Sequence, residues 1–108
     1  MNILDYHTSG GKNVIKTYTD ALPEVQRTEI LEARQEISEF GLEAFEKLNT
    51  RQLVGKLWEI KLSQNRVMYV IADRDNVAFL HICKKQKGKA AKHEIRKAVK
   101  RAKKEGLM

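Results

Sequence analysis

The chain has 108 residues, of which 42% are hydrophobic, with one cysteine and a formal net charge of +7. This length predicts one domain over residues 1–108, and the hydrophobic content is too high for a disordered chain. Cys83 has no partner for an internal disulfide, and neither a signal peptide nor an apolar run of membrane-spanning length is present, so we expect a cytoplasmic protein without membrane contact.

The N-terminal half shows the patterns of one strand and of two or three helices, the third being only a turn or two. A short apolar pair within residues 1–8 predicts an edge strand, and three later segments repeat apolar residues every three or four positions, as on one face of a helix. Pro23 suits the first turn of the second helix, and Gly41 suits its C-terminal cap. The expected helices are Lys12–Leu22, Pro23–Phe40 and Leu42–Leu48.

Three runs rich in branched and aromatic residues follow, separated by short polar connectors. Such connectors are typical of hairpins, so the runs predict an antiparallel meander. Alternation places Trp58, Ile60 and Leu62 on one face, which we expect to be core. It places Leu57, Glu59 and Lys61 on the other, which we expect to be partly open. The predicted strands are Leu53–Leu62, Arg66–Ala72 and Val77–Cys83.

The last predicted helix, Lys89–Glu105, lies in the most basic part of the chain. Lys84–Lys104 holds eleven of the 21 Lys and Arg residues and one of the 14 acidic residues, Glu94, so it carries +10 and the remainder −3. Neutralised phosphates release counterions, so this asymmetry favours a nucleic-acid partner, with a solvated charged helix as the alternative. The order of elements predicts an α+β fold, in which N-terminal helices pack against a small antiparallel sheet and a basic helix ends the chain.

Basic residues near the strand ends are the first candidates for a binding site. A short hairpin after Lys61 would bring Arg66 beside it, and Lys84, Lys85 and Lys87 follow the third strand. The expected result is a shallow basic surface with Glu59 as its acid, while ordinary cross-strand charge pairing is the alternative.

Two further residues have reactive side chains within the last strand. His81 is either a hydrogen-bonded core residue or a catalyst, and Cys83 is either a buried structural residue or a thiol with a lowered pKa. The histidines and the cysteine lack the spacing of a metal site, and there is no glycine-rich phosphate loop or dinucleotide fingerprint. We therefore expect neither a metal nor a cofactor.

Four short motifs occur in a characteristic order along the chain. They are Leu57–Lys61 (LWEIK), Asn65–Tyr69 (NRVMY), Phe79–Lys87 (FLHICKKQK) and Glu94–Ala98 (EIRKA). Together with the Ser9–Lys12 segment that precedes the first helix, they resemble the RelE/ParE superfamily of toxins from type II toxin–antitoxin systems. The HigB branch, with its phage-derived, Gp49-like members, is the most similar, and the resemblance covers nearly the whole chain.

The resemblance implies a RelE-like fold and a ribosome-dependent endoribonuclease that cuts mRNA in the ribosomal A site. The implied chemistry is free of metal: the ribose 2′-hydroxyl attacks the adjacent phosphate, while Lys and Arg stabilise the developing charge. The implied partners are mRNA, rRNA and a cognate antitoxin, expected to carry a helix-turn-helix domain. Two alternatives remain: a gyrase inhibitor of the ParE type, and a non-catalytic nucleic-acid-binding module.

The family's functional positions carry over onto four basic residues, with Arg66 best placed to contact the scissile phosphate. These residues are Lys61, Arg66, Lys84 and Lys85. Two departures are visible: Lys61 stands where many members have arginine, and Ile95 stands where some have a tyrosine that stacks on the base. The general base is unassigned among Glu59, His81 and His93. The residues expected to bind RNA are Lys87, Lys92, Arg96, Lys100 and Lys103.

Overall fold

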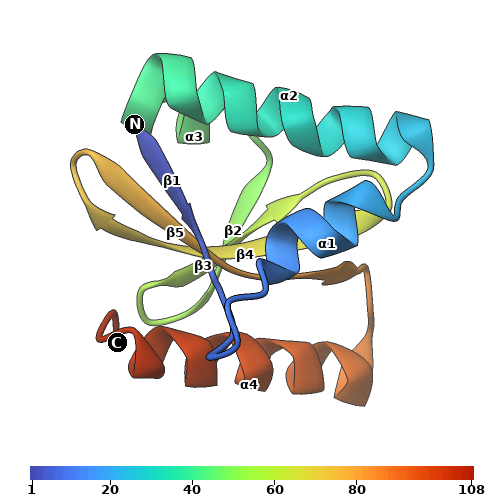
Figure 1. Ribbon diagram of the computed structural model, residues 1–108, viewed down its shortest axis with the longest axis vertical. Coiled ribbons are helices and arrows are strands. Elements are labelled where there is room, and N and C mark those ends of the chain that lie inside the picture. The colour runs from blue at the N-terminus through green and yellow to red at the C-terminus, as the bar shows by residue number, and fades with distance from the viewer.

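The computed structural model describes all residues from Met1 to Met108, in one five-stranded sheet with helices on both faces (Figure 1). The strands are β1 (Asn2–Asp5), β2 (Thr50–Val54), β3 (Leu57–Lys61), β4 (Asn65–Asp73) and β5 (Asn76–Lys84). The helices are α1 (Val14–Asp20), α2 (Glu24–Phe40), α3 (Ala44–Lys47), which follows a 3-10 turn at Gly41–Glu43, and α4 (Gly88–Lys104). The predicted α+β fold with a basic C-terminal helix is confirmed.

The sheet has the strand order β1-β5-β4-β3-β2. Strands β2 to β5 form the expected antiparallel meander. At the far edge β1 runs parallel to β5, so the first and last strands of the chain are neighbours. The predicted edge strand in residues 1–8 is therefore present, and it makes the sheet mixed rather than purely antiparallel.

The prediction of a single strand over Leu53–Leu62 is wrong. A turn at Gly55-Lys56 divides this run, and Val54 pairs with Leu57 across it. Gly55 has a φ of +53°, a conformation that glycine adopts without a steric penalty and that a two-residue hairpin turn requires at its first position. The apolar run thus contains a hairpin, and β2 begins at Thr50.

Each face of the sheet has its own hydrophobic core, because neighbouring residues of a strand point to opposite faces. Val67 belongs to the core under the N-terminal helices and Met68 to the core under α4. Buried Ile30 and Ile37 from α2 complete the first core, together with Ile15 from α1. On the second face α4 contributes Ala98 and Ala102, whose small side chains allow the helix to lie close to the strands.

Trp58 lies outside both cores, which corrects the prediction that it is buried with Ile60. Its exposed fraction is 37%, whereas Ile60 is 1% exposed. The two helices α1 and α2 pack mainly over β5 and β1, and β3 lies only one strand from the opposite edge. Trp58 therefore lies on the predicted face of the sheet, but the helices cover this part of the face only partly.

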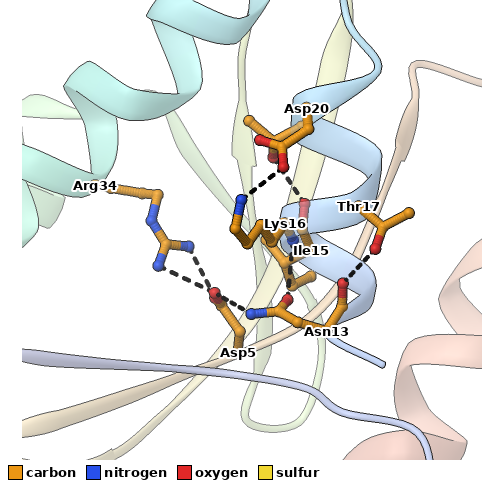
Figure 2. A network of polar contacts seen from close by, with 8 residues as sticks. Asp5, Asn13, Ile15, Lys16, Thr17, Asp20 and Arg34 are labelled. Carbon is orange, nitrogen blue, oxygen red and sulfur yellow. Dashed lines mark hydrogen bonds and ion pairs between the residues drawn. The ribbon is translucent and has the colours of Figure 1, made fainter. Parts of the chain in front are cut away.

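A polar network fixes β1 and the start of α1 to α2 (Figure 2). Arg34 of α2 donates from Nη1 and Nη2 to the two carboxylate oxygens of Asp5, at 2.8 and 3.1 Å. Asn13 donates to the same carboxylate at 3.1 Å, and its own side-chain oxygen caps α1 by accepting from the backbone N–H of Lys16. One carboxylate at the end of β1 thus connects three segments. None of the helices combines the length and hydropathy that a membrane span requires.

Candidate active site

A groove opens between the sheet and the N-terminal half of α4, at the end of the sheet where β3 stops and β4 starts. Its walls come from four strands, from the segment after β5 and from one face of α4. The lining residues are Arg51, Glu59, Lys61, Arg66, Met68, Cys83, Lys84, Gln86, Ala91, Glu94 and Ile95. Four of the predicted site residues, Glu59, Lys61, Arg66 and Lys84, therefore meet here.

The register of three adjacent strands places Lys61 and Arg66 side by side. Lys61 of β3 pairs directly with Arg66 of β4, which pairs in turn with Cys83 of β5. The hairpin prediction that Arg66 lies beside Lys61 is thus confirmed. Lys84 pairs with Asn65 and lines the same groove, whereas the exposed Lys85 lies outside it.

The guanidinium group of Arg66 is held from one side. Its Nη1 donates to the backbone carbonyls of Leu62 and Asn65, at 2.7 and 3.0 Å. The neighbouring Asn65 is fully buried, accepts from the Tyr18 hydroxyl at 2.6 Å and donates to Gln26 at 3.0 Å. The turn that carries Arg66 is therefore anchored to α1 and α2.

The cations of the groove differ in their charge partners. Arg51 lies 2.7 Å from the carboxylate of Glu59, an ion pair on a glutamate that is only 3% exposed. No acidic side chain forms an ion pair with Lys61, Arg66 or Lys84. Three positive charges are thus free to meet an anion. The expected partly open face is wrong for Leu57 and Glu59, which are buried, and Glu59 is paired with Arg51.

His81 lies behind the groove and does not line it. The residue is 6% exposed, and its Nε2 contacts Oε2 of Glu94 on α4. Arg101 Nη1 lies 2.9 Å from Nδ1 of the same ring and also donates to the Leu80 carbonyl at 3.0 Å. Burial lowers the pKa of His81 below its ordinary value, although Glu94 opposes this shift. His81 is thus a buried, hydrogen-bonded residue, and its catalytic role stays a prediction.

Cys83 is buried, and burial raises the pKa of its thiol to about 12, with further contributions from Glu94 and Glu59. The alternative of a lowered thiol pKa is therefore wrong. His81, Cys83 and Glu94 offer ligand atoms within 4.8 Å of one another, a set whose types suit zinc. Both ring nitrogens of His81 are already engaged, so a metal ion would have to displace one of those contacts.

The predicted RNA-binding residues of the last segment are all exposed. They are Lys87, Lys92, Arg96, Lys100 and Lys103. Those on α4 recur every three or four residues and so follow one another along the helix. This stripe continues the positive charge of the groove along the outer surface of the molecule.

Comparison with known proteins identifies the family of this chain. The family described as "Phage derived protein Gp49-like (DUF891)" matches residues 17–103, which include α2 to β5 and nearly all of α4. The chain belongs to the Gp49-like family. This is a RelE/HigB-like family associated with the toxins of toxin–antitoxin systems and broadly linked to RNase toxins. No curated protein matches the chain.

Sequence reasoning missed three residues in or behind the groove: Arg51 and Glu94, which line it, and Arg101, which contacts His81. Arg51 precedes the run that was predicted as a strand, so its pairing with Glu59 was not visible. Glu94 had a signal, because it is the one acid among the eleven basic residues of Lys84–Lys104. Arg101 had none, since its contact with His81 joins residues 20 positions apart.

Proposed function

We propose that this Gp49-like protein is a toxin of the HigB type, a ribosome-dependent endoribonuclease that cleaves mRNA. The observation that carries the proposal is the set of three cations without charge partners, Lys61, Arg66 and Lys84, at one end of the groove. Lys61 and Arg66 are direct cross-strand neighbours, and Lys84 lines the same groove, so a phosphate bound there would lie among positive charges. An inhibitor that acts without cleaving RNA has no need of such a cluster.

The proposed reaction is an in-line attack of a ribose 2′-hydroxyl on the adjacent phosphate, with release of the 5′ oxygen. Negative charge grows on the non-bridging phosphate oxygens as the new bond forms. Arg66 is oriented by two backbone carbonyls before substrate arrives, so its remaining N–H groups would stabilise that charge without reorganisation. Lys61 and Lys84 would share this role from either side.

The remaining predicted residues take supporting roles in this proposal. Lys85 lies outside the groove, so we assign it to contacts with the RNA backbone together with the exposed cations of α4. Glu59 would hold Arg51 at the groove wall through their ion pair. The buried His81 would support the groove indirectly, through its contact with Glu94. The stripe on α4 would dock against rRNA, since phosphate contacts supply affinity that is independent of sequence.

Induced expression in bacteria tests the proposed function. We expect growth arrest together with internal breaks in translated mRNAs, mapped by primer extension at early times after induction. A message whose start codon has been removed provides the control, because it should stay intact. Growth arrest with intact mRNA and inhibited gyrase would instead support the ParE-type alternative, and RNA binding without arrest would support the binding module.

A toxin family implies an antitoxin partner in general, and we propose a helix-turn-helix protein encoded beside this gene. A segment with a charge of +10 next to the groove is readily masked by an acidic protein segment. Co-expression with the adjacent open reading frame should restore growth and yield a complex that co-purifies. Failure of both would remove the antitoxin from the proposal.

A further inference from the structure

A chain of polar contacts runs from the interior of the α4 core to the groove. Arg101 begins it, with its guanidinium 4.8 Å from the centre of the Tyr6 ring and hydrogen-bonded to the Leu80 carbonyl. The chain continues through His81 and ends at the carboxylate of Glu94, which lines the groove. Its three members come from two elements, α4 and β5, that are packed against each other.

The direction of the hydrogen bonds follows from the chemistry of arginine. A guanidinium group carries only donors and does not lose its proton in proteins. Nδ1 of His81 must therefore accept from Arg101, and in the neutral ring the proton is left on Nε2. Nε2 then donates to Oε2 of Glu94. The Cys83 thiol faces the same carboxylate, and Oε1 can accept a further hydrogen bond from a substrate hydroxyl.

The same contacts keep Glu94 ionised. Partial burial would raise the pKa of this carboxyl group, but the hydrogen bond from His81 and nearby positive charges outweigh that effect and lower it below its ordinary value. Glu94 is thus a carboxylate at neutral pH. Its side chain is 20% exposed, so it is accessible from the groove.

None of the three bases considered from the sequence has these properties. Glu59 is 3% exposed and paired with Arg51, so a substrate hydroxyl would not reach it. His81 is buried behind the groove, and His93 is exposed and does not line it. Glu94 is the one accessible carboxylate that shares the groove with Lys61, Arg66 and Lys84.

We infer that Glu94 is the general base of the RNA cleavage, with His81 and Arg101 as the residues that position it. This inference rests on the proposed endoribonuclease function. The 2′-O–H bond breaks as its proton passes to Oε1 of Glu94, and the 2′ oxygen forms a bond to phosphorus. The P–O5′ bond breaks with its electron pair on the 5′ oxygen, which takes a proton from water. The products are a 2′,3′-cyclic phosphate and a 5′-hydroxyl end, and Glu94 returns its proton to water.

The test is single-turnover cleavage of mRNA on reconstituted ribosomes, with ribosome binding and melting temperature measured on the same samples. We expect Glu94→Gln, which keeps the size of the side chain, to slow cleavage by about 10²–10⁴-fold with binding unchanged. Glu105→Gln, on an exposed carboxylate that follows α4, is the matched control and should cleave at the wild-type rate. Glu94→Asp should fall between wild type and Glu94→Gln.

Two substitutions of His81 test its positioning role. His81→Gln retains an N–H donor in reach of Glu94 and should keep most of the activity. His81→Leu removes the donor and should slow cleavage at least about tenfold, which is less than the loss expected from removing the general base itself. A purely structural role would instead lower the melting temperature or ribosome binding of both variants equally.

The outcomes separate this inference from the proposed function. If wild type cleaves and Glu94→Gln cleaves within a few-fold of it, Glu94 is not the base although the protein is a nuclease. The assignment would also be overturned if Glu94→Gln lost folding or ribosome binding while the rate of cleavage by the bound, folded protein stayed normal. If wild type leaves ribosome-bound mRNA intact, the proposed function itself fails.

Discussion

The two longest helices, α2 and α4, have 17 residues each and lie on opposite faces of the same sheet, yet their outer surfaces carry opposite charge (Figure 1). Helix α2 contains five glutamates and two arginines, whereas α4 contains eight basic residues and one glutamate. Each buries a narrow apolar stripe against its own core. Packing therefore leaves the exposed positions free to differ, and the difference gives the molecule one face suited to a polyanion.

The grooves beside these helices show the same contrast. The groove along α2 is the larger, about 400 Å³ against about 140 Å³. Its lining contains Glu29, Glu32, Glu36 and Glu39 and no basic residue. A groove of this kind repels RNA, so the sign of the charge, more than the size of the hollow, distinguishes the candidate site.

Two arginines with similar anchoring give the largest expected contrast between the faces. Arg66 in the groove and Arg27 on α2 each donate from Nη1 to a backbone carbonyl. Arg66→Ala should slow mRNA cleavage by about 10²–10³-fold, because it removes a donor that stabilises charge in the transition state. Arg27→Ala should cleave at the wild-type rate. Equal activity of Arg66→Ala and wild type, with both folded, would make Arg66 a structural residue of the hairpin.

Substitutions on the α2 side of the sheet should change the stability of the protein and not its cleavage activity. Asp5→Asn keeps the shape of the side chain but removes the charge that Arg34 meets with two hydrogen bonds. We expect the free energy of unfolding to fall by about 2 kcal/mol, because hydrogen bonds to charged groups contribute about 1.5–3 kcal/mol each and this pair is partly exposed. Urea denaturation measures the change. Cleavage activity per folded molecule should stay at the wild-type level.

Binding to the ribosome should depend on the charge of α4 and not on that of α2. Replacing Lys92, Lys100 and Lys103 by Gln should lower the slope of log affinity against log salt by about 0.7–0.9 for each phosphate that the protein no longer neutralises. Replacing Glu32 and Glu39 on α2 by Gln should leave the slope unchanged. An unchanged slope in the lysine variant would show that these lysines only solubilise the protein.

The smallest expected effect is a dependence of stability on pH that arises beneath α4. His81 has a lowered pKa in the folded protein, so its contribution to stability is complete above the unfolded value of 6.5 and is lost as pH falls towards the folded value. The free energy of unfolding of wild type should therefore decline between pH 7 and pH 5 more steeply than that of His81→Leu. One proton limits the difference in slope to about 1.4 kcal/mol per pH unit. Parallel curves would contradict the buried neutral state of His81.

Local patterns in the sequence predicted much of the fold and one half of the groove. The short connection between β3 and β4 restricts the register, and this is why the neighbourhood of Lys61 and Arg66 followed from the sequence. The turn at Gly55-Lys56 did not, because it lies within an apolar run that also reads as one strand. Without that turn, the pairing of Arg51 with Glu59 could not be predicted either.

The other half of the groove depends on how α4 docks. Periodicity identified the helix and its apolar stripe, but it does not say which strand residues the stripe covers. The contacts of His81 with Glu94 and Arg101 span 13 and 20 residues of sequence and exist only once the helix is in place. For Trp58 the strand alternation predicted the correct face of the sheet. How far the helices extend over that face could not be predicted from the sequence.

The most direct test of the proposed nuclease activity is cleavage of a 5′-labelled mRNA on purified ribosomes programmed with a defined A-site codon. The protein should cut within that codon only when ribosomes are present, and the downstream fragment should carry a 5′-hydroxyl that polynucleotide kinase labels without prior phosphatase treatment. Arg66→Ala should leave the message intact, and Arg27→Ala should cut it. An intact message with wild-type protein bound to the ribosome would contradict the account, as would equal cutting by Arg66→Ala.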